Sequence, residues 1–104
     1  MCGIGGMVAL SAELLPDLER DLRVMNHLQA HRGPDGEGTW RHPQGYVGFA
    51  HRRLSIIDLT TGGQPMRVGE DWIVFNGEIY NYIEIRKELG ADEFRTTSDT
   101  EVIL

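Results

Sequence analysis

Apolar residues at helical spacing place the strongest constraint on the fold of this chain. A run of small and apolar residues from Gly3 to Leu10 comes first and predicts a buried strand. Apolar side chains then recur every three or four positions, at Leu14, Leu18, Leu22, Met25 and Leu28. This spacing predicts an amphipathic helix with its apolar stripe toward the core. The charged residues of this helix are expected to face solvent: Asp17, Glu19, Arg20 and Arg23.

Turn-forming sequences divide the middle of the chain. Residues 31–36 contain Gly-Pro and Asp-Gly pairs, and both pairs favour turns, so this segment is predicted to be a loop. Residues 62–65, Gly-Gly-Gln-Pro, interrupt the pattern in the same way. The segments around these breaks predict strands near residues 38–40, over residues 46–57 and over residues 72–75.

A capping signature follows the last predicted strand. Asn81 with Glu84 three residues later is typical of a helix start, and Gly90 is a suitable stop. A helix is therefore predicted over residues 83–89.

The same signature returns near the end of the sequence, at Ser98 and Glu101. Only the apolar residues 102–104 follow it. One helical turn buries little apolar surface by itself. We therefore expect these residues to be the N-terminal part of a larger domain, and we expect them to fold poorly when made alone.

Composition narrows the class of protein. A chain of 104 residues is long enough for one domain and too short for two. The formal net charge of −6 argues against nucleic acid as a main partner, because phosphate binding requires a basic surface.

The same sequence argues against export and membrane insertion. No apolar run approaches the roughly 20 residues that span a bilayer, and the acidic Glu13 and Asp17 soon follow the glycine-rich start. A single cysteine excludes an internal disulfide framework. We expect a cytoplasmic protein with no membrane contact.

Cys2 is the first candidate for chemistry. Methionine aminopeptidase removes an initiator methionine when the next residue is small, and this would leave Cys2 with both a thiol and a free α-amino group. An α-amine has a reference pKa of about 7.7–8.0 and a thiol of about 8.5, so such an amine can accept the thiol proton near neutral pH. Position alone leaves the alternative of an inert, buried strand residue.

Three further segments carry residue types suited to a site. Arg53 can bind a carboxylate through the planar fork of its guanidinium group. The side-chain amide of Asn76 and the backbone N–H of Gly77 are donors of the kind that form an oxyanion hole. Asp99, at a predicted helix start, can face a cation. Taken one at a time, these residues are better explained as a surface ion pair, a hairpin turn and a helix cap.

Taken together and in order, five sequence motifs are similar to one family. The chain resembles the glutaminase domain of glutamine-dependent asparagine synthetases, among the class II (N-terminal nucleophile) amidotransferases. The resemblance covers almost the whole chain and rests on residues 1–6 (MCGIGG), 32–36 (RGPDG), 53–58 (RLSIID), 76–81 (NGEIYN) and 98–101 (SDTE).

The resemblance implies an α+β fold, the four-layer α/β/β/α sandwich of the N-terminal nucleophile hydrolases, of which this chain would be the N-terminal portion. It implies that Cys2 is the nucleophile, that Arg53 binds the α-carboxylate of glutamine, and that Asn76 and Gly77 stabilise the oxyanion. The remaining implied contacts with glutamine are the acids that hold its α-amino group, Glu78 and Asp99, and a pocket-lining strand formed by Leu54, Ser55, Ile56 and Ile57.

The resemblance also implies partners outside this chain. L-Glutamine is the expected substrate, and its ammonia would pass to a C-terminal synthetase domain that amidates aspartate or another carboxylate with ATP and magnesium. No cofactor or metal is expected in this chain itself. The full-length protein could form a homodimer.

Other interpretations remain open from the sequence. A cysteine–histidine protease would draw its base from His27, His31, His42 or His51, and His27 with His31 could begin a metal site. A truncated, non-catalytic glutamine-binding module is an alternative of a different class. Within the amidotransferases, relatives that make glucosamine phosphate or phosphoribosylamine, or that act on sugars or peptides, are the nearest alternatives.

Overall fold

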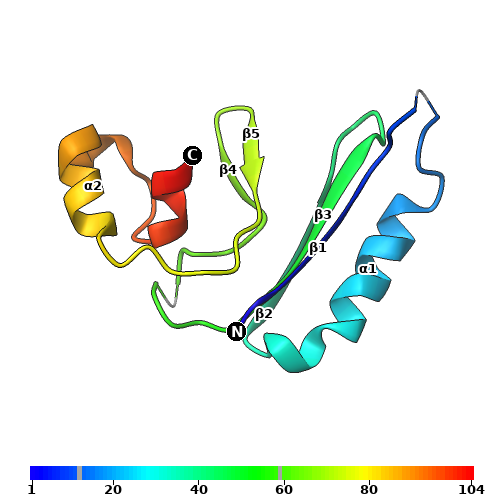
Figure 1. Ribbon diagram of the computed structural model, residues 1–104, viewed down its shortest axis with the longest axis horizontal. Coiled ribbons are helices and arrows are strands. Elements are labelled where there is room, and N and C mark those ends of the chain that lie inside the picture. The colour runs from blue at the N-terminus through cyan, green and yellow to red at the C-terminus, as the bar shows by residue number, and fades with distance from the viewer. Residues whose placement is uncertain (12, 59) are drawn as a thin grey trace.

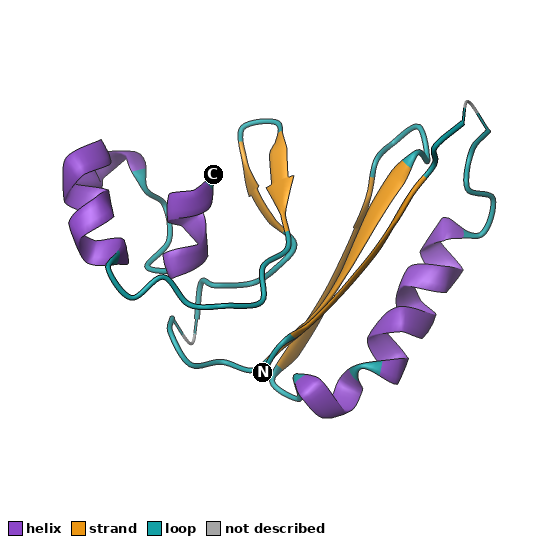
Figure 2. Cartoon of the chain, in the orientation of Figure 1, coloured by secondary structure: helices purple, strands orange, loops and turns teal. Residues whose placement is uncertain are grey.

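The computed structural model describes residues 1–11, 13–58 and 60–104. It is a mixed arrangement of strands and helices, with a helix at each end of the longest axis (Figures 1 and 2). The strands are β1 (Gly3–Val8), β2 (Gly36–Arg41), β3 (Val47–Arg53), β4 (Met66–Val68) and β5 (Asp71–Ile73). The helices are α1 (Leu18–Leu28) and α2 (Tyr82–Leu89), with 3-10 turns η1 (Ala30–Arg32), η2 (Ala91–Glu93) and η3 (Asp99–Ile103).

An antiparallel sheet in the order β1-β3-β2 forms the first part of the molecule. Helix α1 runs alongside this sheet (Figure 1). The apolar core between them consists of Leu18, Leu22 and Ala50, each no more than 3% exposed. Gly48 allows the helix to come this close, because a Cβ there would lie 2.7 Å from a methyl group of Leu22.

The second part contains the β4-β5 hairpin, α2 and η3. Gly69 turns the hairpin with a φ of +60°, a conformation that glycine adopts readily. The indole rings of Trp40 on β2 and Trp72 on β5 stack with their centroids 4.7 Å apart. This aromatic contact joins the two sheets. Within the described ranges, no helix combines the length and apolar composition that a membrane crossing requires.

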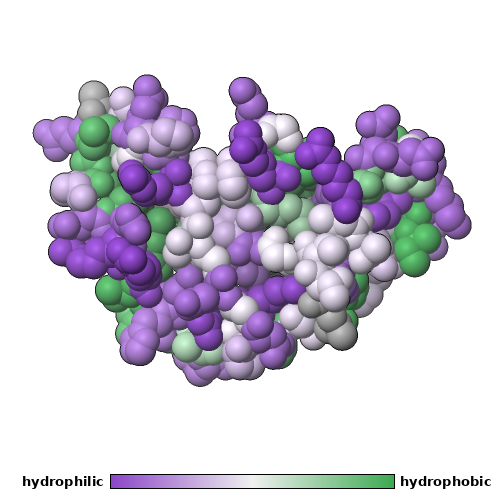
Figure 3. All heavy atoms as spheres, turned by 180° about the vertical axis from the view of Figure 1, so that it is seen from behind, coloured by the Kyte–Doolittle hydropathy of each residue, from purple (hydrophilic) through white to green (hydrophobic). Residues whose placement is uncertain are grey.

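Apolar side chains remain exposed in both parts of the molecule. Hydrophilic side chains cover much of the face seen from behind, and hydrophobic atoms gather in separate areas near both ends (Figure 3). On α1 the exposed apolar residues include Leu28, at 67%, and on α2 they include Leu89, at 61%.

The first helix is shorter than predicted, although its charged face is confirmed: Asp17, Glu19, Arg20 and Arg23 are exposed. The predicted apolar stripe began at Leu14, but α1 begins at Leu18 and Leu14 is 56% exposed. The backbone N–H of Leu15 instead donates to the carbonyl of Gly45 in the β2–β3 turn, at 3.2 Å. This turn therefore holds the chain in a non-helical path before α1.

The predicted strands are present but differ in extent, and the first, β1, is mostly not buried as expected, since Ile4 is 46% and Val8 62% exposed. The strand expected over residues 46–57 ends at Arg53, since the next peptide groups bond to side chains: Leu54 N–H to Cys2 Sγ and Ser55 N–H to Asp35. Strand β4 was not predicted.

Helix α2 begins at Tyr82, one residue before the predicted start, and ends at Leu89 as predicted, with Asn81 before it and Gly90 after it. The side chain of Asn81 makes no capping hydrogen bond within the described residues, so the predicted capping box is absent there. The reciprocal capping box predicted at Ser98 is wrong. The Ser98 hydroxyl does accept from Thr100 N–H, at 3.2 Å, but the Glu101 carboxylate accepts from the N–H groups of Arg95 and Thr96 instead. The segment that follows is a 3-10 turn.

Candidate active site

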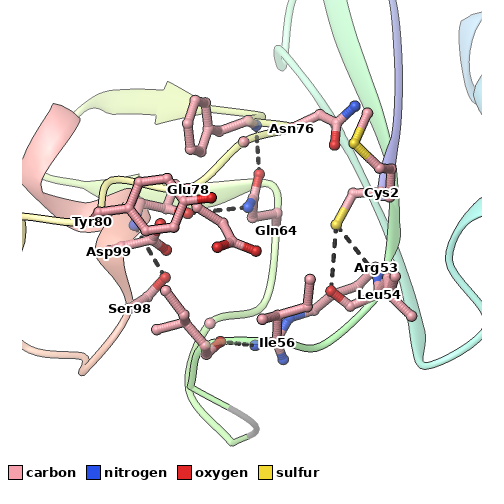
Figure 4. A pocket seen from close by; sticks show the side chains of 16 residues that line it. Cys2, Arg53, Leu54, Ile56, Gln64, Asn76, Glu78, Tyr80, Ser98 and Asp99 are labelled. Atoms are coloured by element: carbon pink, nitrogen blue, oxygen red, sulfur yellow. Dashed lines mark hydrogen bonds between the residues drawn. The ribbon is translucent and has the colours of Figure 1, made fainter.

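Segments far apart in the sequence line one cavity of about 190 Å³ between the two parts of the molecule (Figure 4). Its residues come from the start of the chain, the end of β3, the loop before β4, the segment after β5 and the start of η3. They are Met1, Cys2, Arg53, Leu54, Ile56, Ile57, Gly62, Gln64, Phe75, Asn76, Gly77, Glu78, Tyr80, Ser98, Asp99 and Thr100.

Strand pairing places Cys2 beside Arg53 and Leu54. Gly3 is opposite Arg52 in the antiparallel ladder, so the residues just outside that pair, Cys2 and Arg53, are neighbours. The Cys2 sulfur accepts from Leu54 N–H at 3.3 Å and lies 3.5 Å from the Leu54 carbonyl oxygen (Figure 4). Arg32 Nε donates to the Cys2 carbonyl at 3.1 Å. Both the side chain and the backbone of Cys2 are therefore held in place.

The Arg53 guanidinium group is oriented by the turn that follows it. One terminal nitrogen, Nη2, donates to the carbonyl oxygens of Ile57, at 3.2 Å, and Asp58. A Cβ on Gly62 would lie 2.6 Å from the same nitrogen. Glycine at this position therefore leaves room for the guanidinium group.

Asp58 stabilises the turn that presents these carbonyls. It has a positive φ of 51°, and its carboxylate accepts from the backbone N–H groups and the hydroxyls of Thr60 and Thr61. Partial burial raises the pKa of Asp58, but the hydrogen bonds from Thr61 and Thr60 outweigh it and hold the pKa well below its ordinary value. The Thr61 hydroxyl also accepts from Thr97 N–H at 3.3 Å, which ties this turn to the segment before Asp99.

Asn76 and Gly77 follow β5 on a peptide that is held from both sides. Phe75 N–H donates to Gln64 Oε1 at 2.6 Å, and the Phe75 carbonyl lies 3.4 Å from His51 Nε2. A Cβ on Gly77 would lie 2.6 Å from the Phe75 ring, so this position cannot take a side chain without rearrangement.

His51 is buried in β3, at 1% exposed. Burial lowers the pKa of His51, the hydrogen bond with the Phe75 carbonyl raises it and the Arg53 charge lowers it, so that the pKa lies below its ordinary value. The neutral ring donates through Nε2 to this carbonyl, while Nδ1 has no partner within the described residues.

Asp99 and Glu78 line the side of the cavity formed by the second part of the molecule (Figure 4). Asp99 is 6% exposed, and its carboxylate accepts from Ile79 N–H at 2.8 Å. This bond fixes Asp99 next to the segment that carries Glu78.

Nearly all the predicted site residues therefore lie at one cavity. Ser55 is the exception, because it is not among the lining residues and its N–H donates to the Asp35 carboxylate at 2.8 Å. Leu54, Ile56 and Ile57 line the cavity, but from a loop and not from the predicted strand.

The sequence did not single out Gln64, Tyr80 or Thr100. Gln64 stands in a Gly-Gly-Gln-Pro sequence that was interpreted only as a break between strands. Its polar side chain between two turn-forming residues was the available signal.

The alternatives based on histidine gain no support. His27, His31, His42 and His51 are absent from the lining of this cavity. Across residues 1–11, 13–58 and 60–104, no group of three or more His, Cys, Asp and Glu side chains could hold a metal ion.

Comparison with known proteins identifies the family. The protein-family model described as a glutamine amidotransferase domain matches residues 1–104, and the chain belongs to this family. It is homologous to the N-terminal part of glutamine-hydrolysing asparagine synthetases, which confirms the resemblance predicted from the motifs.

Three relatives illustrate this relationship. The chain is 49% identical over 113 residues to asparagine synthetase [glutamine-hydrolyzing] 1 of Bacillus subtilis and 44% over 108 residues to asparagine synthetase 2 of that organism. It is 42% identical over 105 residues to asparagine synthetase [glutamine-hydrolyzing] 1 of Arabidopsis thaliana. The matches cover 100%, 100% and 99% of this chain but only 17%, 14% and 18% of the relatives. The chain thus spans less than a fifth of their length.

Proposed function

We propose that this chain hydrolyses the side-chain amide of glutamine as part of a longer protein, with Cys2 as the nucleophile. The observation that carries the proposal is the meeting of Cys2, Arg53, Asn76 and Asp99 at one cavity. Such a cavity offers a thiol, a guanidinium group, an amide donor and a carboxylate to a single small substrate.

Glutamine binds through its two charged backbone groups. Arg53 pairs with the α-carboxylate, since one side of its fork is held by the 57–58 carbonyls and the other side is free to take a ligand within the described residues. Glu78 and Asp99 take the α-ammonium group. Leu54, Ile56 and Ile57 border the substrate, and the role of Ser55 in binding stays a prediction.

The chemical step begins once Met1 has been removed. The freed α-amine of Cys2 takes the thiol proton, and Sγ attacks the side-chain amide carbon of glutamine. Asn76 and the Gly77 N–H stabilise the tetrahedral oxyanion. The protonated amine returns its proton to the leaving nitrogen, ammonia departs and a thioester remains. Water then hydrolyses the thioester, giving glutamate and the free thiol.

The longer protein uses the ammonia. By similarity to the named relatives, a C-terminal synthetase domain would amidate aspartate or another carboxylate with ATP and magnesium, in a cytoplasmic protein that could be a homodimer. We further propose that this chain forms part of a four-layer α/β/β/α sandwich.

Substitution of Cys2 in the full-length protein tests the proposal. Cys2→Ala and Cys2→Ser should abolish glutamate release from glutamine, while product formation from added ammonia should persist, because free ammonia bypasses the thioester. Mass spectrometry of the same sample should show that Met1 is absent. Glutaminase activity of Cys2→Ala close to that of the parent protein would overturn the assignment. Glutamine binding by the parent without any turnover would instead favour a non-catalytic module.

A further inference from the structure

We propose that Gln64 is a positioning residue that joins the oxyanion side of the glutamine site to its ammonium-binding side. The inference rests on the proposed function. The Gln64 side chain lies in the cavity between the segments that carry Asn76 and Asp99 (Figure 4). It contacts a direct neighbour in sequence of each of these two residues.

The acceptor end of Gln64 holds the segment after β5. Its Oε1 accepts from Phe75 N–H at 2.6 Å, and His51 Nε2 is 3.4 Å from the Phe75 carbonyl. Phe75 is therefore held at both its N–H and its C=O. Asn76 follows directly, so its backbone starts from a fixed point.

The donor end of Gln64 holds the start of η3. Its Nε2 donates to the Thr100 hydroxyl at 3.2 Å, and Thr100 is 3% exposed. Thr100 N–H donates in turn to Ser98 Oγ at 3.2 Å. Asp99 lies between these two residues, and its own carboxylate accepts from Ile79 N–H at 2.8 Å.

Glutamine suits this position because its amide has an acceptor and a donor side by side. Its backbone also packs closely against β2. Gly38 on β2 packs against residues 64–65: a Cβ there would overlap the Gln64 carbonyl oxygen and lie 3.0 Å from Pro65 Cδ. The loop before β4 therefore lies directly against the three-stranded sheet, and the Gln64 side chain reaches from it to the segments that carry Phe75 and Thr100.

The two bonds act on different steps. Loss of the Thr100 contact should loosen Asp99, which grips the substrate in both the ground state and the transition state, and so should raise KM. Loss of the Phe75 contact should displace the oxyanion donors, which act mainly in the transition state, and so should lower kcat.

Steady-state glutamate release by the full-length protein tests this division. Thr100→Val removes the hydroxyl at nearly constant shape and should raise KM about 3- to 10-fold with kcat within about twofold, as one net hydrogen bond allows. Gln64→Met should show the same rise in KM and also lower kcat about 3- to 10-fold. The double variant should match Gln64→Met, because the Gln64–Thr100 hydrogen bond that Thr100→Val removes is already lost in Gln64→Met. Gln44→Met, at an exposed position in the β2–β3 turn, is the control and should resemble the parent.

The outcomes separate this inference from the function on which it rests. A parent protein without glutamine turnover would defeat both. An active parent with unchanged kcat and KM in Gln64→Met would defeat only the role of Gln64. A lower apparent kcat with unchanged KM in both Thr100→Val and Gln64→Met would also overturn it. A general loss of folded protein has this effect, since it lowers only the apparent kcat. If Gln64→Met does not fold, a Thr100→Val variant with unchanged KM is sufficient to reject the inference.

Discussion

The two parts of the molecule are stabilised in different ways. In the part formed by β1–β3 and α1, hereafter the sheet region, Leu18, Leu22 and Ala50 form an apolar core beneath a continuous backbone ladder. In the part from β4 to η3, hereafter the polar region, Met66 is the only buried apolar residue among those described. Its other buried residues are Ser98, Asp99, Thr100 and Glu101.

This difference matters because the site draws on both regions. Cys2 and Arg53 are positioned by the ladder of the sheet region, whereas Asn76 and Asp99 are positioned by side-chain hydrogen bonds. An apolar core tolerates small changes in shape. A buried polar network loses much of its stability when one member is removed, because the partners stay buried without a bond. The polar region should therefore be the more sensitive half to single polar substitutions.

The largest effect is expected from Glu101→Ala. The Glu101 carboxylate accepts from the N–H groups of Arg95 and Thr96 and lies 3.5 Å from Arg86, whose side chain is 15% exposed. Its loss leaves the Arg95 and Thr96 N–H groups without their acceptor and removes the carboxylate that faces Arg86, which keeps its hydrogen bond to the Ser98 carbonyl. This should cost about 3–5 kcal/mol of local stability.

Hydrogen exchange on the full-length protein measures this effect region by region. Exchange should accelerate in peptides from residues 82–103 and remain near the parent rate in β3. Glu88→Ala, an exposed site on α2, is the matched control. Equal acceleration in both regions would show that they do not open separately.

Asn76→Ala should affect catalysis strongly and stability weakly. Removal of one oxyanion donor typically lowers kcat by about 10²–10³, with a smaller change in KM. Arg53→Ala in the sheet region should instead weaken glutamine capture and so raise KM, because the substrate carboxylate loses its charged partner. Glutaminase kinetics on both variants give the contrast. A raised KM with unaltered kcat in Asn76→Ala would remove its oxyanion role.

Leu22→Ala should destabilise the sheet region by about 2–4 kcal/mol, through lost burial and the cavity left behind. Leu22 is 1% exposed in α1, whereas Leu28 on the same helix is 67% exposed, so Leu28→Ala should change stability by less than about 0.5 kcal/mol. Exchange should accelerate in peptides from residues 18–28 and 47–53 and not in those from residues 82–103. The reverse pattern would contradict the proposed division.

Acid should produce the smallest effect and should act on the two regions in different pH windows. His51 has a pKa below its ordinary 6.5, so the stability that its neutral form contributes is lost as pH falls from about 6.5 toward the folded pKa. Burial raises the pKa of Glu101, but hydrogen bonds from Arg95 and Thr96 and the Arg86 charge bring it below 4.5. The contribution of Glu101 is therefore complete above pH 4.5 and is lost below it.

Denaturant unfolding of the full-length protein at a series of pH values measures how steeply the free energy of unfolding changes with pH in each of these two windows. Glu101→Gln should reduce the slope below pH 4.5 and leave the slope near pH 6 in place. If Glu101→Gln left the slope below pH 4.5 unaltered, the loss of stability in acid would come from other carboxylates.

The comparison also shows where sequence reasoning succeeded. Side-chain periodicity placed α1, because an amphipathic helix must turn its apolar side to a core whatever the rest of the chain does. An apolar run and turn-forming sequences placed the strands of the sheet region. Residue chemistry offered Cys2, Arg53, Asn76 and Asp99 as candidates, and the structure brings them to one cavity. Their catalytic and binding roles stay predictions. The motifs supplied the family, which the comparisons confirm.

Only the tertiary structure decided how these residues meet. The end of β3 at Arg53 depends on side-chain acceptors at Cys2 and Asp35, which lie 52 and 20 residues away from the peptides they hold, Leu54 and Ser55. Gln64 acquires a role only because Phe75 and Thr100 come within hydrogen-bond distance of it, 11 and 36 residues along the chain. Periodicity and capping rules describe neighbours a few residues apart, and contacts of this range are set by the way whole elements pack.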